Sequence, residues 1–252
     1  MDENGGIIVA LDTHDPDAAE TLVDRLMPDV SMYKVGMELF YSCGPSIVRR
    51  LAAVGARLFL DLKLHDIPTT VGRAAAALAL PGVDIIDVHA SGGSRMMREA
   101  LAAVRRAASA RGARSPKVVA VTLLTSIGEE EFSRELFPGR GAVIEEHVVR
   151  LARLAKECGL DGAVTSPLEV SAIRRACGDD FVTVVPGVRP MWARDTHDQT
   201  RCMTPRQAVL SGADYLVVGR PITQASSPKE AAARLLDEVR EAKRDARDQS
   251  DN

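Results

Sequence analysis

Short apolar runs alternate along the chain with longer segments whose apolar residues recur at helical spacing. The first run, 6–12, ends shortly before Asp15 and Pro16, which suit the N-cap and first turn of a helix. The pattern predicts strands at 6–12, 32–37, 57–63, 83–90, 117–125, 162–166, 182–189 and 215–220. It predicts helices between and after them, including 45–54, 68–80, 143–158, 205–210 and 228–246, with others opening at Gly93 and near Pro167.

The predicted strands are nearly continuous in Val, Ile and Leu, as strands covered on both faces are. Alternation of strand and helix favours a parallel sheet, and eight such units in 252 residues predict a closed barrel. The predicted fold class is therefore α/β, a single (β/α)8 TIM barrel over 1–252. No GxGxxG follows the first strand, which disfavours a dinucleotide-binding sheet. We expect flexible termini at 1–5 and about 245–252, because the tail from Lys243 is charged and lacks apolar anchors.

Composition narrows the class of protein further. The net charge is −3 with both signs interspersed, so nothing favours a nucleic-acid partner, and any phosphate site must be local. The four cysteines lie far apart and form no CxxC pair, which favours reduced thiols over a metal cluster or disulfides. No secretory signal opens the chain, and no apolar run approaches the roughly 20 residues that span a bilayer. We expect a cytoplasmic protein without a membrane partner.

Polar residues end the apolar runs, where barrels of this type place their active sites. Asp61 and Lys63 are two apart on the third strand, so their side chains share a face and point into the barrel mouth. Such a buried pair is tolerated only when its charges are matched. Lys34 and Asp66 could extend it into an alternating row. The alternative is a charge-balanced plug, with Asp66 only capping the next helix. Asp12, His89 and Thr125 end other runs; His89 could line the mouth or the core, and His65 is expected only to brace its loop.

The last two strands each end in a glycine beside an arginine. Gly187 with Arg189, and Gly219 with Arg220, combine close backbone approach with a forked cationic donor, in the loops that usually bind phosphate in this fold. The alternative is two ordinary turns. The intervening stretch 190–203 is polar, holds Trp192 and is long enough to be a lid. No His, Cys or carboxylate cluster has metal-ligand spacing and no GxSxG motif occurs, which disfavours metal hydrolysis and serine catalysis.

The segment 61–70, DLKLHDIPTT, closely resembles the signature of the orotidine 5′-monophosphate decarboxylase family. DxKxxD alone is shared with related sugar-phosphate decarboxylases, whereas the longer motif is specific. Further blocks occur in the family's order across nearly the whole chain, at 10–12, 34–36, 124–126, 186–189, 198–199, 203–205 and 219–220.

This resemblance implies conversion of orotidine 5′-monophosphate to uridine 5′-monophosphate, the last step of de novo pyrimidine nucleotide synthesis, with no cofactor and no metal. It makes Lys63 the proton donor to C6 of the pyrimidine, and it places Asp61 near the substrate carboxylate, where Asp61 also holds Lys63. It also implies that Asp66, Ile67 and Thr70 reach into the neighbouring subunit's site, hence a homodimer.

The resemblance also assigns the substrate contacts. It gives the ribose hydroxyls to Asp12 and Lys34, the pyrimidine to Thr125 and Gln199, and the phosphate to Arg189, Gly219 and Arg220, with Gln199 also near the phosphate. The stretch 191–197 departs from the family's usual composition, which puts the role of Arg189 and the lid in doubt.

Two rival functions remain open on the sequence. One is another phosphosugar enzyme of this barrel type, such as a 3-keto-gulonate 6-phosphate decarboxylase or a hexulose 6-phosphate synthase, which would need Mg²⁺. The other is a non-catalytic nucleotide-binding barrel, which would keep Gly219 and Arg220 but have no use for Lys63.

Overall fold

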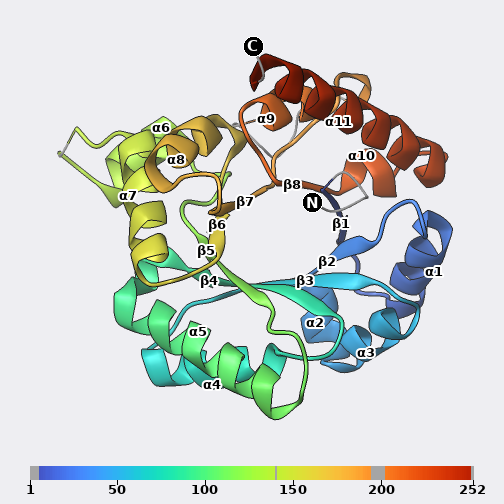
Figure 1. The fold of residues 1–252 in the computed structure, drawn as a ribbon, viewed down its shortest axis with the longest axis horizontal. Helices are drawn as coiled ribbons and strands as arrows, with labels where there is room; N and C mark the ends of the chain where they lie inside the picture. Colours follow the sequence, from blue (N-terminus) through green and yellow to red (C-terminus); the bar gives the residue numbers. More distant parts are fainter. Residues whose placement is uncertain (1–5, 140, 194–201, 251–252) are drawn as a thin grey trace.

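A closed parallel barrel forms the centre of the computed structural model, which describes residues 6–139, 141–193 and 202–250. Each strand pairs with the next along the chain, and the first pairs with the last. Figure 1 shows the ring of strands in the middle with the helices around it. The TIM barrel and its eight predicted strands are confirmed, as β1 (Ile7–Leu11), β2 (Met32–Gly36), β3 (Arg57–Leu64), β4 (Val83–His89), β5 (Lys117–Val121), β6 (Gly162–Val164), β7 (Val182–Val185) and β8 (Tyr215–Val218).

Several strands end earlier than predicted. The fifth strand was expected to run to residue 125 and the seventh to 189, but β5 ends at Val121 and β7 at Val185. Pro186 has no N–H for the sheet, and Gly187 has a φ of 82° that bends the chain away. The residues that were predicted to extend these strands therefore form loops at the barrel mouth.

The long helices follow the prediction, and several short ones were not predicted. Asp15 Oδ1 accepts the N–H groups of Asp17 and Ala18 at the start of the first helix, as expected. The helices are α1 (Pro16–Leu26), α2 (Met37–Cys43), α3 (Ser46–Ala53), α4 (Pro68–Leu78), α5 (Gly93–Ala110), α6 (Glu129–Glu131), α7 (Ile144–Glu157), α8 (Val170–Cys177), α9 (Pro205–Leu210), α10 (Arg220–Thr223) and α11 (Pro228–Ser250). Shorter helical turns are η1 (Ala90–Gly92), η2 (Phe132–Leu136), η3 (Pro167–Glu169) and η4 (Met191–Ala193).

The apolar core has two layers. The inner layer fills the barrel and draws residues from every strand, including Ile8, Met32, Phe59, Ile85 and Val217. The larger outer layer lies between the strands and the surrounding helices. Because successive residues of a strand face opposite layers, both must be apolar, which explains the continuous apolar runs.

The last helix continues to Ser250, past its predicted end near residue 246. Arg206 Nη2 lies 2.6 Å from Asp245 Oδ2, and Ala242 is fully buried, so the charged tail is tied to the domain beyond Lys243. Flexibility of the two ends stays a prediction, and residues 1–5 and 251–252 lie outside the described residues. Within the described ranges, no helix has the length and apolar character that crossing a bilayer requires.

Candidate active site

A row of alternating charges lies at the mouth of the barrel. Lys34 Nζ, on β2, lies 2.9 Å from Asp12 Oδ1 and 3.6 Å from Asp61 Oδ2. Lys63 Nζ contacts Asp61 Oδ1 on the same strand, β3. With Phe59 below them, Lys34, Asp61 and Lys63 line a cavity of about 140 Å³. The structure thus brings Asp12, Lys34, Asp61 and Lys63 together, in a chain of ion pairs.

Asp66 does not join this row within the chain. Its Oδ1 accepts the N–H of the next residue, Ile67, at 2.6 Å, and its side chain is exposed. Ile67 itself is the N-cap residue of α4 and receives no side-chain cap, so the capping role considered for Asp66 is not what the structure has. Because β3 ends at Leu64, the chain has already turned out of the barrel when it reaches Asp66.

The ion pairs shift the acidity of the buried groups. Burial alone would raise the pKa of Asp61, but a hydrogen bond with Asp87 and the ammonium groups of Lys63 and Lys34 outweigh it and lower the pKa to about 2. Burial would lower the pKa of Lys63, yet Asp87 and Asp61 outweigh burial and raise it. Asp61 is therefore an anion and Lys63 a cation at neutral pH.

Asp87, on β4, is a member of the site that the sequence analysis missed. It is fully buried, its Oδ1 accepts the backbone N–H of Lys63 at 2.9 Å, and its Oδ2 lies 3.7 Å from Lys63 Nζ. The signal was an acidic residue within the apolar run VDIIDVHA. Asp84, in the same run, instead pairs with Arg57 at the other end of the barrel (Nε to Oδ2, 2.7 Å).

Thr165, at the end of β6, is a second missed residue. It is fully buried and lines the 140 Å³ cavity, and its Oγ1 has no hydrogen-bond partner among the described residues. A hydroxyl left without a partner in such a place is costly unless a ligand satisfies it.

The 140 Å³ cavity, called the deep cavity below, shares lining residues with a larger cavity, which in turn shares lining residues with a third. Leu124 and Thr125 line both the deep cavity and a second cavity of about 490 Å³, which also touches Asp12. Arg220 and Gln224 line this second cavity and a third one of about 710 Å³. Three spaces with different chemistry therefore follow one another across the mouth.

Gly219, at the end of β8, lies close to the end of β1. A Cβ at Gly219 would lie 3.3 Å from Asp12 Oδ2 and 3.5 Å from the Cβ of Ala10. A side chain at the end of β8 would therefore require the Asp12 carboxylate to shift by a few tenths of an ångström.

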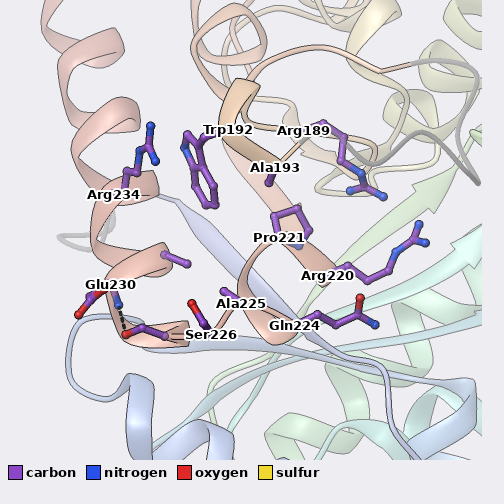
Figure 2. Close-up of a pocket in the computed structure, with 12 residues that line it drawn as sticks. Arg189, Trp192, Ala193, Arg220, Pro221, Gln224, Ala225, Ser226, Glu230 and Arg234 are labelled. Atoms are coloured by element: carbon purple, nitrogen blue, oxygen red, sulfur yellow. Dashed lines mark hydrogen bonds between the residues drawn. The ribbon is translucent and has the colours of Figure 1, made fainter.

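The third space contains the two arginines predicted to bind phosphate. Figure 2 shows the side chains of Arg189 and Arg220 extending to the same side, while Trp192 lies between Ala193 and Arg234. Arg234 Cζ is 4.9 Å from the centre of the Trp192 ring, the geometry of a cation–π contact.

The predicted lid is described only at its two ends. Arg189 N donates to Met203 O at 2.9 Å, which joins the start and the end of the segment. Residues 194–201 lie outside the described residues, and Gln199, predicted to contact the pyrimidine and phosphate, lies among them.

Two histidines stack beside the mouth. The rings of His65 and His89 are 5.2 Å apart and 29° from parallel. His65 is exposed and His89 half-buried, and neither lines the 140 Å³ cavity. Burial, followed by the positive charges of His65 and Lys63, lowers the pKa of His89 to about 4. His89 therefore lies behind the site as a neutral imidazole at pH 7.

The carboxylates of the mouth are matched to ammonium groups rather than grouped as metal ligands. Within residues 6–139, 141–193 and 202–250, no three His, Cys, Asp or Glu side chains are placed to hold one ion. All four cysteines are free thiols.

Known proteins resemble this chain over nearly its full length. The model of the orotidine 5′-phosphate decarboxylase / HUMPS family matches residues 5–235. The orotidine 5′-phosphate decarboxylase of Moorella thermoacetica is 52% identical over 233 residues, covering 92% of this chain and 91% of that protein. That of Syntrophomonas wolfei is 46% identical over 235 residues, covering 93% and 98%. Among solved structures, the orotidine 5′-phosphate decarboxylase of Lactobacillus acidophilus superposes with a TM-score of 0.80 at 41% identity, covering 92% of this chain and 98% of that one.

Proposed function

Because the chain belongs to the orotidine 5′-phosphate decarboxylase / HUMPS family, we propose that it decarboxylates orotidine 5′-monophosphate with Lys63 as proton donor and without a metal or cofactor. The family description also covers another activity, but the relatives at 46–52% identity are named as orotidine 5′-phosphate decarboxylases. The enzyme is accordingly a carboxy-lyase, and decarboxylation belongs to pyrimidine nucleotide synthesis. A cytoplasmic location, where free nucleotides are made, is part of the proposal.

The observation that carries the proposal is the ammonium group of Lys63, held by Asp61 at the edge of the 140 Å³ cavity. Loss of CO₂ leaves an electron pair at C6 in the plane of the pyrimidine, where the ring π-system cannot delocalise it. A fixed cation aimed at that carbon stabilises the developing charge without reorganisation. The same group then donates a proton to C6, and the Asp61 carboxylate keeps Lys63 charged despite its burial.

The order of the three spaces supports this substrate. A nucleotide has a flat base, a polar sugar and an anionic phosphate in a row. The deep cavity with Thr125 would take the pyrimidine, Asp12 and Lys34 would contact the ribose hydroxyls, and Arg189 and Arg220 would bind the phosphate. Gly219 would leave space for the atoms that join the ribose to the phosphate. We also keep the proposal that Gln199 contacts the pyrimidine.

We also propose a homodimer whose subunits complete each other's sites. Asp66 is exposed and turned out of its own barrel, Ile67 is 67% exposed, and Thr70 is exposed on the first turn of α4. An exposed isoleucine beside a carboxylate is what an interface would cover. Asp66 would then approach Lys63 of the partner and add a second carboxylate to it.

The test follows the ultraviolet absorbance of orotidine 5′-monophosphate with purified protein in EDTA. We expect full activity in EDTA and loss of turnover in Lys63→Ala, with the dimer retained. Activity that vanishes with the chelator would favour the Mg²⁺-dependent rival, and turnover by Lys63→Ala would remove Lys63 as the donor. Mixed dimers of Asp66→Asn and Lys63→Ala should regain part of the activity, since one of their two sites has both residues.

A further inference from the structure

The strand that carries Lys63 is irregular opposite Asp87. Leu60 on β3 pairs with Ile86 on β4, and Leu64 pairs with Val88. Three residues of β3, 61–63, therefore lie opposite the single residue Asp87. Such a bulge breaks the ladder of backbone hydrogen bonds and redirects the side chains within it.

The backbone of Lys63 needs support in this bulge. Its φ is 50°, and it is the one non-glycine residue with positive φ in the described part of the chain. Residues with a side chain rarely adopt this conformation, and they keep it where the surroundings enforce it. Asp87 Oδ1 provides that constraint, because it accepts the Lys63 N–H that the interrupted ladder leaves without a strand partner.

We propose that Asp87 is a positioning residue for Lys63, which fixes the bulge through the Lys63 N–H and faces Asp61 as a neutral carboxylic acid at neutral pH. It is not a residue that touches the substrate, because it is fully buried and does not line the cavity. The proposal rests on the proposed function only where it concerns turnover.

The surroundings of Asp87 favour the neutral form. Asp87 Oδ2 is buried, and no described residue donates a hydrogen bond to it. Lys63 Nζ is 3.7 Å away and already contacts Asp61. A proton on Oδ2 would give this atom a partner, since it could be donated to the Asp61 carboxylate. Burial first, and then the negative charge of Asp61, raise the pKa of Asp87 well above its ordinary value.

Few other charged groups lie near the Asp87 and Asp61 side chains. From β3 come Asp61 and Lys63, and Lys34 on β2 acts through Asp61. On β4 itself, His89 is close enough to feel the charge of Lys63. On the other side, Asp87 pairs with Val119 of β5, which is apolar and buried. At high pH, Asp87 loses its proton, and its charge then raises the pKa of Lys63.

Two variants separate the roles of Asp87. Asp87→Asn keeps an acceptor for the Lys63 N–H and a donor toward Asp61, so we expect kcat at pH 7 within about threefold of wild type. Asp87→Leu removes both, so kcat should fall about tenfold or more while KM changes little, because the ribose and phosphate contacts remain. Thr183→Val is the matched control, since Thr183 is a fully buried polar residue of β7 outside the site. It should lower stability and leave kcat unchanged.

The pH profile gives a readout that loss of stability alone does not move. In Asp87→Asn the alkaline limb of kcat should lie at lower pH than in wild type, because Lys63 has lost a neighbour that is charged at high pH. Thr183→Val should leave the limb in place. An unmoved limb in Asp87→Asn, a kcat as low as that of Asp87→Leu, or full activity in a folded Asp87→Leu would each overturn the proposal. Should Asp87→Leu not fold, Asp87→Asn decides alone.

Infrared spectroscopy tests the proton on Asp87 without any substrate. The wild-type minus Asp87→Asn difference spectrum at pH 7 should contain the C=O stretching band of a protonated carboxylic acid. A carboxylate band in its place would refute the neutral acid. Because this result does not depend on turnover, it remains informative if the protein fails to decarboxylate orotidine 5′-monophosphate, which would refute the proposed function instead.

Discussion

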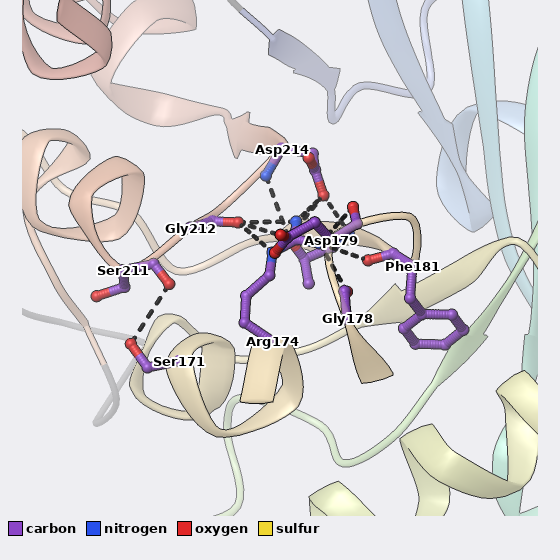
Figure 3. A network of polar contacts seen from close by, with 9 residues as sticks. Ser171, Arg174, Gly178, Asp179, Phe181, Ser211, Gly212 and Asp214 are labelled. Atoms are coloured by element: carbon purple, nitrogen blue, oxygen red, sulfur yellow. Dashed lines mark hydrogen bonds and ion pairs between the residues drawn. The ribbon is translucent and has the colours of Figure 1, made fainter. Parts of the chain in front are cut away.

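Arg174, on α8, should be a large determinant of stability with no role in turnover. Its guanidinium group lies at the N-terminal ends of β7 and β8, away from the barrel mouth (Figure 3). Nε and Nη2 donate to Gly212 O at 2.9 and 2.8 Å, and Nη1 donates to Phe181 O at 2.9 Å. Nη2 also pairs with Asp214, whose Oδ2 accepts the N–H of Thr183 at 2.7 Å. One side chain thus joins the segments that lead into two neighbouring strands.

We expect Arg174→Met to lower the free energy of unfolding by about 3–5 kcal/mol. Water can replace the arginine at the exposed carbonyls of Gly178 and Asp179, so those bonds contribute little. The carbonyls of Phe181 and Gly212 are less accessible, and a charged donor to such a group contributes about 1.5–3 kcal/mol. Two such bonds give about 3–6 kcal/mol, and because Asp214 is 37% exposed and its pair with Arg174 is partly screened, we expect the lower part of this interval. For a chain of this size, the melting temperature should fall by about 10 °C.

Urea unfolding followed by circular dichroism, at fixed protein concentration, measures the change. Arg134→Met is the control, because Arg134 is 71% exposed and its pair with Glu130 should contribute less than about 1 kcal/mol. At 25 °C the folded Arg174→Met enzyme should keep its kcat. A loss of stability below about 1 kcal/mol, or a large drop in kcat of the folded protein, would refute this reasoning.

Three further predictions concern the mouth. Trp192 is the only tryptophan of the chain, and it lies against Arg234 in the third cavity. Binding of uridine 5′-monophosphate should therefore change the tryptophan fluorescence, and Arg234→Met should change the fluorescence of the free protein. Unchanged spectra would contradict the placement of Trp192. The folded state disfavours protonated His89, whose pKa is lowered from 6.5 to about 4, so stability should fall as pH drops through this window, and less so in His89→Gln on urea unfolding at each pH. Gly219→Ala must displace Asp12 by a few tenths of an ångström, so KM should rise about three- to tenfold at nearly unchanged melting temperature, and an unchanged KM would show that this contact is not used.

The fold could be predicted because both faces of each strand are covered by apolar layers. The exact ends of the strands could not be predicted from the same signal. Leu123 and Leu124 continue the apolar run beyond β5, but Leu124 lines the deep and second cavities instead of joining the sheet. A mouth that binds a flat organic ring needs apolar residues of its own, so hydrophobicity does not fall where the strand ends.

The site could be predicted as far as its charges interrupt apolar runs at strand ends. Asp61, Lys63 and Lys34 were identified in this way. Asp84 and Asp87 gave the same signal within one run, but only the pairing of β3 with β4 places Asp87 beside Lys63 and Asp84 beside Arg57. The positive φ of Lys63 has no signature in the sequence, because the residue is neither glycine nor asparagine.

The two ends of the barrel hold buried charges in different ways, and the difference separates stability from chemistry. At the N-terminal end, the donors of Arg174 are directed at carbonyls, at Thr183 Oγ1 and at Asp214, so the charge is satisfied. At the mouth, Thr165 Oγ1 has no hydrogen-bond partner among the described residues, and Lys63 has a backbone conformation that is costly on its own. A hydroxyl left unsatisfied at the edge of a cavity lowers stability, and a ligand that satisfies it recovers that free energy on binding. Selection for stability alone would have removed both features, so the position of Thr165 and Lys63 at the cavity is a physical reason, independent of family resemblance, to place the chemistry there.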